Sequence, residues 1–298
     1  MNGLEITVKD LIKVYRIGKI EVQALRGLNM SVAKGEIVAI IGPSGSGKTT
    51  LLNVIGGLDK ATAGSVRIGE TEVTSLNDSG LVDVRRRLVG HIFQTLNLVP
   101  TLTAEENVEL PMILAGIGTS NRKKRAEELL GVVGLSDRIG HKPDEMSGGE
   151  QQRVSIASAL ANDPPVILAD EPTGELDSVN AKMITDFMVK VNEEFGKTIV
   201  MVTHDANVAR ACNRILRIED GVIKAELEPT QIVGEVSSLS IVETLRNRVS
   251  SVEMQLQKLD EAFRSRVIDG DTYVEAHQKM KLTKKTLEEE LHRMGVTT

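Results

Sequence analysis

The residues from Gly42 to Thr49 have the types and spacing of a phosphate-binding loop, G-x-x-x-x-G-K-[ST]. The run reads Gly42, Pro43, Ser44, Gly45, Ser46, Gly47, Lys48, Thr49, and Thr50 follows it. Glycines let the backbone curl so that its N–H groups point at an anion, and a following helix adds its positive N-terminal end. Lys48 can reach the β- and γ-phosphates, and the Thr49 hydroxyl can bind Mg²⁺. Residues 42–50 therefore predict a nucleoside triphosphate site that uses magnesium.

A pair of carboxylates, Asp170 and Glu171, follows the apolar run Val166 to Ala169. Asp170 can hold Mg²⁺, directly or through water, and Glu171 can act as general base on the attacking water. Two adjacent acids in a loop are usually solvated, so alone they are a weak signal of function. Together with the phosphate loop they become a strong one. Because no Asn-Lys-x-Asp motif for reading guanine occurs, we expect ATP rather than GTP as the substrate.

Strands and helices that alternate along the chain must bring these residues together. Short β-branched runs at 36–41, 166–169 and 198–202 predict buried strands, and helical stretches follow them. The pattern over residues 1 to about 225 predicts an α/β fold with a mostly parallel sheet covered on both faces. The segment from about 96 to 160 is helix-like and predicts a helical subdomain inserted into residues 1–228.

Residues 229–298 predict a separate α-helical extension. Ser240 with Glu243, and Thr272 with Glu275, fit capping boxes that open two helices. The first has an a/d seam made of Val242, Leu245, Val249, Val252, Leu256, Leu259 and Phe263. The short break between the helices predicts an antiparallel hairpin or coiled coil. Such a hairpin either packs on its own domain or contacts a second copy or a partner.

Composition limits the classes of function. The chain has 298 residues, 41% of them hydrophobic, and a formal net charge of -6, which disfavours a general nucleic-acid binder. We interpret the basic clusters at 85–87 and 122–125 as solvated helix faces. The single cysteine, Cys212, fits a reduced compartment. No stretch approaches the roughly 18 apolar residues of a membrane span, so a membrane role would require spans from another chain.

The segment from Met146 to Arg153 resembles the signature motif of ABC ATPases. Its residues Ser147, Gly148, Gly149 and Glu150 stand at an expected helix start, which favours an anion. In that family this surface closes on the γ-phosphate of ATP bound to the other subunit. The resemblance therefore implies a P-loop NTPase fold, ATP hydrolysis, and a head-to-tail dimer that encloses two ATP molecules.

Further residues match elements of the same family in order. Tyr15 matches the aromatic residue that stacks on adenine, although its position also fits a core tyrosine. Gln94 matches the glutamine that contacts Mg²⁺ and water, and Leu176 with Asp177 matches the loop that crosses the dimer interface. His204 matches the histidine that contacts the γ-phosphate. The implied catalytic set is thus Lys48, Gln94, Glu171 and His204.

Within the family, the runs 93–111 and 170–174 resemble the MacB and LolD ATPases. This resemblance implies a separate integral-membrane permease as partner, and a peripheral location at the cytoplasmic face of the cell membrane. The work implied is lipoprotein extraction, export or mechanotransmission. Glu175 stands where Asn is common, and Ser158 where Arg is usual; both departures bear on dimer closure. The hairpin lies outside the common core.

Two other classes of function are alternatives. A soluble ABC ATPase in DNA repair, translation or cluster assembly is the main alternative. This chain shows neither a very long coiled coil inside the ATPase nor a second ATPase cassette, although its hairpin keeps that alternative open. A non-hydrolysing scaffold is disfavoured because Lys48, Asp170, Glu171 and His204 are all present.

Overall fold

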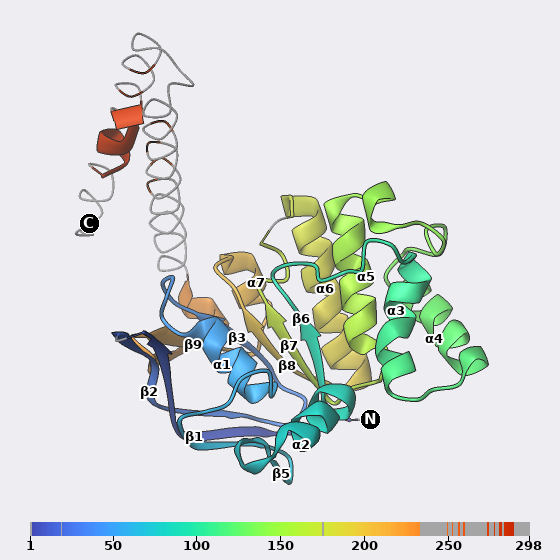
Figure 1. Ribbon diagram of the computed structural model, residues 1–298, viewed down its shortest axis with the longest axis horizontal. Coiled ribbons are helices and arrows are strands. Elements are labelled where there is room, and N and C mark those ends of the chain that lie inside the picture. The colour runs from blue at the N-terminus through green and yellow to red at the C-terminus, as the bar shows by residue number, and fades with distance from the viewer. Residues whose placement is uncertain are drawn as a thin grey trace. The chain divides into compact units, whose positions relative to one another are not determined.

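The computed structural model describes most of the chain up to residue 232 and scattered positions beyond it. The described residues are 2–18, 20–174, 176–232, 249, 252, 256, 259, 273, 277, 280, 281 and 283–288. Two compact units are present, Met1–Val233 and Gly234–Thr298. The first unit carries both sheets and the helices α1 to α7 (Figure 1).

A six-stranded sheet forms the centre of the first unit. Its strands are β3 (Ile37–Ile41), β6 (Val89–Ile92), β7 (Val166–Asp170), β8 (Thr198–Val202), β9 (Arg214–Glu219) and β10 (Val222–Leu227). Their order is β10-β9-β3-β8-β7-β6, and all neighbours are parallel except β10 and β9. Every residue of β3 and β8 is buried, as expected for a parallel sheet covered on both faces. The predicted α/β fold and the three predicted strands are confirmed.

A second, antiparallel sheet was not predicted. It consists of β1 (Ile6–Ile17), β2 (Ile20–Val32), β4 (Ala63–Ile68) and β5 (Thr71–Glu72), in the order β2-β1-β4-β5. The expectation that strands and helices alternate from the first residue is therefore wrong for this region. No helix separates β1 from β2 because Gly18, with a φ of 64°, allows a tight turn between two long strands.

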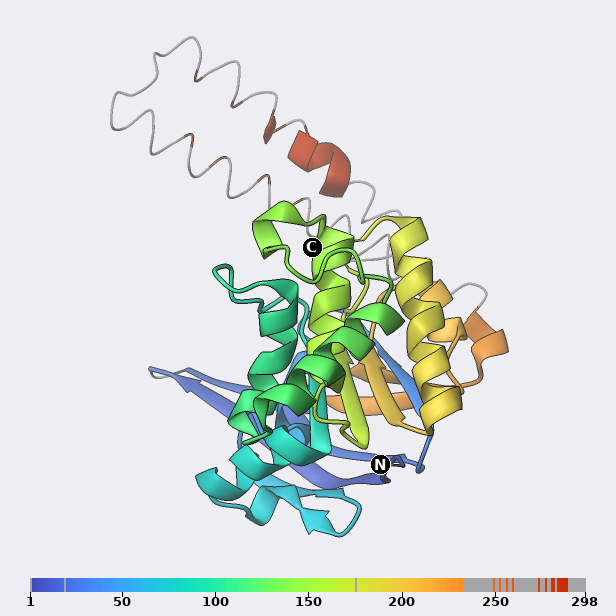
Figure 2. The same cartoon turned by 90° about the vertical axis from the view of Figure 1, so that its right-hand side faces the viewer.

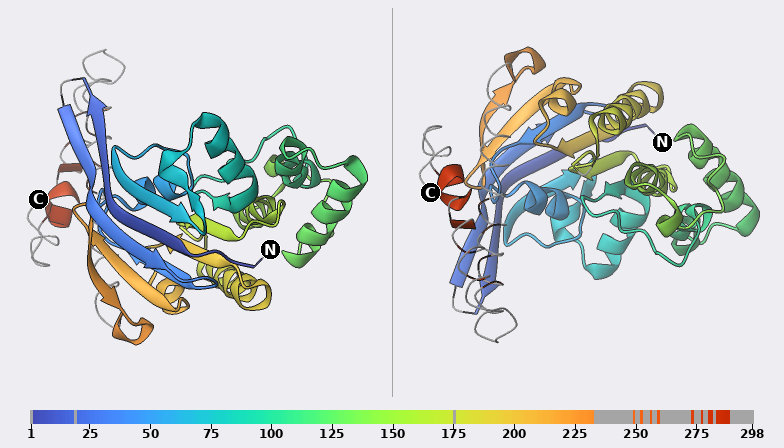
Figure 3. Two further views of the ribbon diagram at one scale, coloured as in Figure 1. Left: turned by 90° about the horizontal axis from the view of Figure 1, so that it is seen from below. Right: turned by 90° about the horizontal axis from the view of Figure 1, so that it is seen from above.

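Helices cover the parallel sheet and form a group beside it. They are α1 (Lys48–Ile55), α2 (Asp78–Asp83), α3 (Ala104–Leu114), α4 (Thr119–Val132), α5 (Gly148–Leu160), α6 (Ser178–Phe195) and α7 (Ala206–Arg210). Short helical turns are η1 (Val73–Ser75), η2 (Val84–Leu88), η3 (Pro143–Glu145) and η4 (Pro229–Ile232). Figure 2 shows α3, α4 and α5 packed together, and Figure 3 places α3 and α4 at the opposite end from the β1–β2 hairpin. The subdomain bounds, 96–160, stay a prediction.

Helix α1 packs between the two sheets, and this packing holds the phosphate loop. Leu51, Leu52, Val54 and Ile55 of α1 are buried in one core with residues of both sheets. Each such side chain contributes roughly 1.5–3 kcal/mol on burial. Since α1 begins at Lys48, directly after the loop, the position of the loop is set by this core.

The second unit is described at few positions. Val249, Val252, Leu256 and Leu259 are helical and half-buried, and they belong to the predicted seam. The rings of Tyr273 and His277 stack with centroids 5.2 Å apart. Both predicted helix starts, Ser240 and Thr272, lie outside the described residues, so the hairpin and the domain boundary at 228/229 stay predictions. In the described part of the chain, no helix is long and apolar enough to cross a membrane.

Candidate functional site

The phosphate loop connects the buried strand β3 to α1 and depends on glycine at two of its positions. Gly42 has a φ of 152°, and a Cβ there would overlap the carbonyl oxygen of Ile218. Gly47 has a φ of 103°, and a Cβ there would lie 2.6 Å from the carbonyl oxygen of Ala24. The loop thus takes its shape from glycine conformations and from close contact with neighbouring backbone.

Lys48 folds back over the loop. Its Nζ donates hydrogen bonds to the carbonyl oxygens of Gly42, at 2.8 Å, and Pro43, at 3.0 Å. The lysine is 8% exposed, whereas Ser44, Gly45 and Thr49 are exposed. The ammonium group therefore lies inside the ring of the loop, where an anion bound by the loop N–H groups would meet it.

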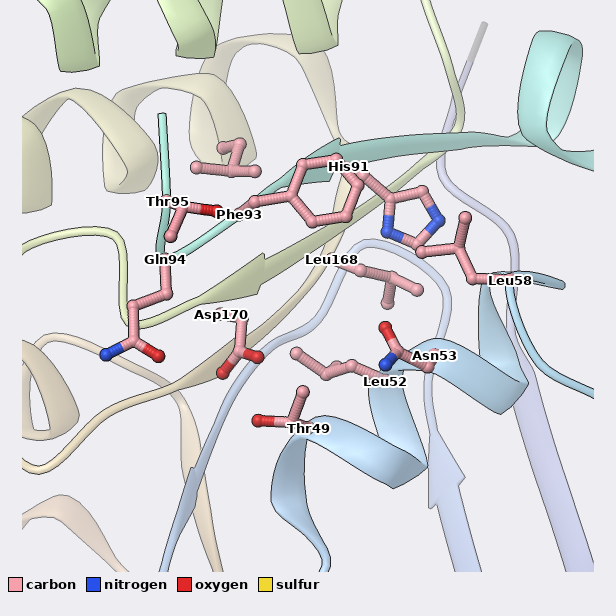
Figure 4. Close-up of a pocket in the computed structure, with 11 residues that line it drawn as sticks. Thr49, Leu52, Asn53, Leu58, His91, Phe93, Gln94, Thr95, Leu168 and Asp170 are labelled. Carbon is pink, nitrogen blue, oxygen red and sulfur yellow. The ribbon is translucent and has the colours of Figure 1, made fainter. Parts of the chain in front are cut away.

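Thr49, Gln94 and Asp170 line one pocket of about 370 Å³. Gln94 follows β6, Asp170 ends β7 and Thr49 lies in the first turn of α1. Figure 4 shows the three polar side chains turned toward a common space. The parallel pairing of β3, β8, β7 and β6 explains this meeting, because it brings the carboxyl ends of the strands to one edge of the sheet.

Asp170 carries a buried oxygen without a partner. Its Oδ1 makes no hydrogen bond to the described residues. Burial raises the pKa of this carboxyl, while a hydrogen bond with Thr49 acts in the opposite direction and the charge of Glu171 adds to the rise. An unpaired buried carboxylate oxygen is costly unless something satisfies it. Together with the Thr49 hydroxyl and the Gln94 amide, it makes a set of oxygen donors that suits Mg²⁺.

Glu171 and His204 form a hydrogen-bonded pair beside this pocket. His204 Nδ1 lies 3.0 Å from Glu171 Oε2, and that hydrogen bond lowers the pKa of Glu171 despite its burial. The backbone N–H of Glu171 donates to the Val202 carbonyl on β8, at 2.9 Å. Glu171 has a φ of 47°, a left-handed conformation that non-glycine residues seldom adopt. An ionised, oriented carboxylate at this edge can accept a proton from water.

Tyr15 lies on β1 and is half-buried. Its hydroxyl donates to Asp59 Oδ2, at 2.7 Å, and the Lys13 ammonium lies 4.7 Å from the centre of its ring. Burial is the main cause of its raised pKa, to which Asp59 also contributes, while a hydrogen bond with Thr50 lowers it. This contact with Thr50 places the ring beside the first turn of α1.

The residues of the predicted signature motif begin α5. Ser147 caps the helix, and its N–H and its hydroxyl both donate to Glu150 Oε2, each at 2.8 Å. These bonds and Arg138 hold the pKa of Glu150 down to about 2. Gly148 is exposed, and Gly149 is buried against Asn180 of α6. The four motif residues do not line the pocket of Thr49, Gln94 and Asp170.

The residues predicted for the interface loop lead into α6. Asp177 caps α6 by accepting from the N–H groups of Val179, at 3.0 Å, and Asn180, at 2.9 Å. Leu176 donates its N–H to the Thr173 carbonyl, at 3.1 Å. Glu175 lies outside the described residues. Ser158 on α5 donates its hydroxyl to the Asn107 carbonyl of α3, at 3.2 Å.

Three residues beside the site were missed by sequence reasoning: Lys13, Asp59 and His91. Lys13 is two residues from Tyr15 on one strand, so the period of two was a usable signal. Asp59 is 44 residues from Tyr15, and nothing local connects them. His91 lines the pocket, stacks on Phe93 with ring centroids 5.4 Å apart, and has its Nε2 3.3 Å from the Gly56 carbonyl oxygen.

His91 should make folding stability depend on pH. Burial lowers its pKa from 6.5 to about 4, with a smaller effect of the charge on Arg85. Between these values the unfolded chain binds the proton and the folded chain does not, so stability falls as pH drops from 6.5 toward 4, by up to about 3 kcal/mol. The variant His91→Gln cannot titrate. Urea unfolding at pH 7.5 and pH 5 should show a smaller pH-dependent loss in this variant, and equal losses would contradict the assignment.

Comparisons with known proteins agree with this geometry. A family model described as ABC transporter matches residues 25–174. An ABC transporter ATP-binding protein of Thermotoga maritima is 53% identical over 215 residues, covering 72% of this chain and 92% of that protein. The macrolide export ATP-binding/permease protein MacB of Syntrophobacter fumaroxidans is 42% identical over 262 residues, 87% of this chain but 36% of that longer protein.

A solved structure gives the same result for the fold. The dimeric post-hydrolysis state of the ATP-binding cassette MJ0796, bound to ADP and Pi, superposes with a TM-score of 0.71. Its sequence is 47% identical, and the match covers 75% of this chain and 98% of that one. At this identity the likeness concerns the family as well as the fold.

Proposed function

The chain belongs to the ABC transporter family of ATP-binding proteins and is an ATP hydrolase, and from this premise we propose that it drives a separate membrane permease as one of two paired ATPase subunits. The MacB/LolD-like group is its place within the family. One observation carries the catalytic part of the proposal: Thr49, Gln94 and Asp170 converge on one pocket, beside an oriented Glu171–His204 pair.

The site has a role for each predicted residue. The backbone N–H groups of the loop, from Ser44 to Thr50, and the Lys48 ammonium bind the β- and γ-phosphates. Thr49, Gln94 and Asp170 would hold Mg²⁺, which would supply positive charge to neutralise the phosphates. Glu171 takes the proton of the attacking water. His204 keeps that carboxylate charged and aimed through the 3.0 Å hydrogen bond.

The signature residues act in the other subunit's site. Ser147, Gly148, Gly149 and Glu150 stand at the start of α5, away from the pocket of their own chain. A head-to-tail pair would bring this helix start to the phosphates bound by the partner. Leu176 and Asp177, at the start of α6, would lie at the interface. The dimeric state named for the MJ0796 cassette supports this arrangement.

The permease is proposed from relatives. The proteins named MacB join an ATP-binding part and a permease in one chain, and this chain matches 36% or 37% of their length. We propose that the ATPase works with a permease of the MacB or LolC type and lies peripherally at the cytoplasmic face of the membrane. Export, extraction and mechanotransmission are the three forms of work that such a pair performs.

Purification of the full chain from native membranes tests this function. We expect an integral-membrane protein with a few spans and a large extracytoplasmic domain to copurify, and the ATPase rate to change when the two are separated. Consistent recovery of the chain without any integral-membrane protein would reject the transporter role and favour a soluble ABC ATPase. Retained ATP hydrolysis in that case would leave the site assignments standing.

A further inference from the structure

Lys13 and Asp59 both contact Tyr15, and neither has been given a role so far. Both oxygens of Asp59 are used: Oδ2 accepts from the Tyr15 hydroxyl, at 2.7 Å, and Oδ1 accepts from Lys13 Nζ, at 2.6 Å. The same Lys13 ammonium lies 4.7 Å from the centroid of the tyrosine ring. Asp59 therefore holds both the hydroxyl of the ring and the cation that covers one of its faces.

Asp59 is itself tied to the helix that follows the phosphate loop. Its backbone N–H donates to the Asn53 carbonyl of α1, at 3.1 Å. The segment after it lies along β1, because Thr62 N–H donates to the Ile12 carbonyl, at 2.8 Å, and Val14 N–H donates to the Thr62 hydroxyl, at 3.0 Å. The carboxylate thus links the strand that carries Tyr15 to the helix that carries Lys48.

The charges of Lys13 and Asp59 are balanced and partly shielded from water. The Lys13 side chain is 11% exposed and that of Asp59 is 28% exposed. Burial would raise the pKa of Asp59, but the hydrogen bonds from Lys13 and Tyr15 outweigh it and the pKa is lowered. Asp59 is therefore ionised at neutral pH, and the tyrosine must be the donor.

The Lys13 ammonium lies over one face of the tyrosine ring, so a stacked base would have to use the other face. An ammonium group above a ring occupies the position that a stacked base would need. The ring stands near the end of the β1–β2 hairpin, where its cross-strand neighbour Val22 is 47% exposed. The contacts to Asp59 and Lys13 restrict rotation of the Tyr15 ring about its side-chain bonds. Fixing it beforehand reduces the entropy lost when a base stacks on it.

We propose that Asp59 is a positioning residue for ATP, which fixes the Tyr15 ring at a set offset from the phosphate loop and presents the face opposite Lys13 to adenine. The proposal rests on the stacking role proposed for Tyr15. In this role Asp59 does not touch the nucleotide, but it determines how strongly stacking of adenine contributes to the affinity for ATP. Phosphate binding should be independent of it.

The sharpest test uses Tyr15→Phe in the full chain. This variant keeps an aromatic ring and the Lys13–Asp59 ion pair, and it removes only the hydroxyl, which contacts Asp59 and Thr50. We expect the Kd for ATP, measured by calorimetry without Mg²⁺, to rise about threefold to tenfold, the worth of one hydrogen bond. The Kd for inorganic tripolyphosphate, which has no base, should stay unchanged. With Mg²⁺ present, KM should rise while kcat is kept.

Asp59→Asn provides the second arm, with Asp78→Asn as a matched control. Asp78 also pairs with a lysine at 2.6 Å, but it is an exposed residue that forms its ion pair with Lys60. We expect Asp59→Asn to weaken ATP binding and to leave the affinity for tripolyphosphate unchanged. We expect Asp78→Asn to change neither affinity. In the double variant with Tyr15→Phe, the loss should be smaller than the sum, since both changes break the same contact.

The results with these variants distinguish the positioning role of Asp59 from the stacking role of Tyr15. If Tyr15→Ala weakens ATP but Tyr15→Phe and Asp59→Asn do not, Asp59 has no positioning role and the stacking role stands. If Tyr15→Ala leaves the ATP affinity unchanged, the stacking role itself is wrong. Equal losses for ATP and tripolyphosphate in Asp59→Asn would assign the residue to the stability of the loop and overturn the proposal.

Discussion

Glu171→Gln is expected to lower kcat for ATP hydrolysis about 100-fold to 1,000-fold, the usual contribution of a general base. Glutamine has the size of glutamate and can still accept the hydrogen bond from His204, but it cannot take a proton from water. The ATP affinity should therefore be kept. Because bound ATP is not consumed, the variant should accumulate as a closed dimer, which size-exclusion chromatography with light scattering would detect.

Glu106→Gln is the matched control for this prediction. Glu106 belongs to the capping box that begins α3 and accepts the N–H of Thr103, at 2.9 Å. It carries the same charge change away from the pocket, so its ATPase rate should stay near that of the native chain. A Glu171→Gln variant that hydrolyses ATP at the native rate, with the permease present, would remove Glu171 from the reaction.

Lys48→Ala is expected to weaken ATP binding about 100-fold and to abolish hydrolysis at ordinary ATP concentrations. The ammonium group makes charge-assisted hydrogen bonds to phosphate, each worth about 1.5–3 kcal/mol. The change also removes the hydrogen bonds of Lys48 to the Gly42 and Pro43 carbonyls, which help to shape the loop. Calorimetry with ATP and a phosphate-release assay would measure both effects.

Lys182→Ala serves as the comparison for Lys48→Ala. Lys182 pairs with Asp186 on the exposed side of α6, at 2.6 Å, and neither residue lines the pocket. Removing it takes away the same charge without touching the loop, so ATP affinity should be unaffected. If Lys48→Ala bound ATP within about threefold of the native chain, the lysine would not hold the phosphates.

Features that depend on consecutive residues could be predicted without the fold. The loop 42–49 is one such feature, since its glycine spacing and the helix start at Lys48 lie within eight consecutive residues. The capping of α5 by Ser147 and Glu150 is another, because both groups lie within one helical turn. The strands β3, β7 and β8 could also be predicted from the sequence, since a strand buried on both faces is apolar throughout.

The antiparallel sheet was harder to predict. Its strands β1 and β4 are more than 40 residues apart, and the pairing of Ile6 with Ile68 depends on the core between them. The Tyr15 ring shows the consequence. Its residue type and position allowed both a stacking role and a core role, and only the contacts with Lys13 and Asp59 show what holds it.

By itself, the sequence determined that this protein has a phosphate loop, an acidic strand end and a signature helix, because each is encoded within a few residues. The tertiary structure decided which of them meet. Thr49, Gln94 and Asp170 share a pocket because β6 pairs with β7, and β3, which leads to Thr49, lies in the same parallel sheet. No local sequence pattern specifies this order of strands. Ser147 caps α5 and does not line that pocket, which also could not be deduced from the local sequence.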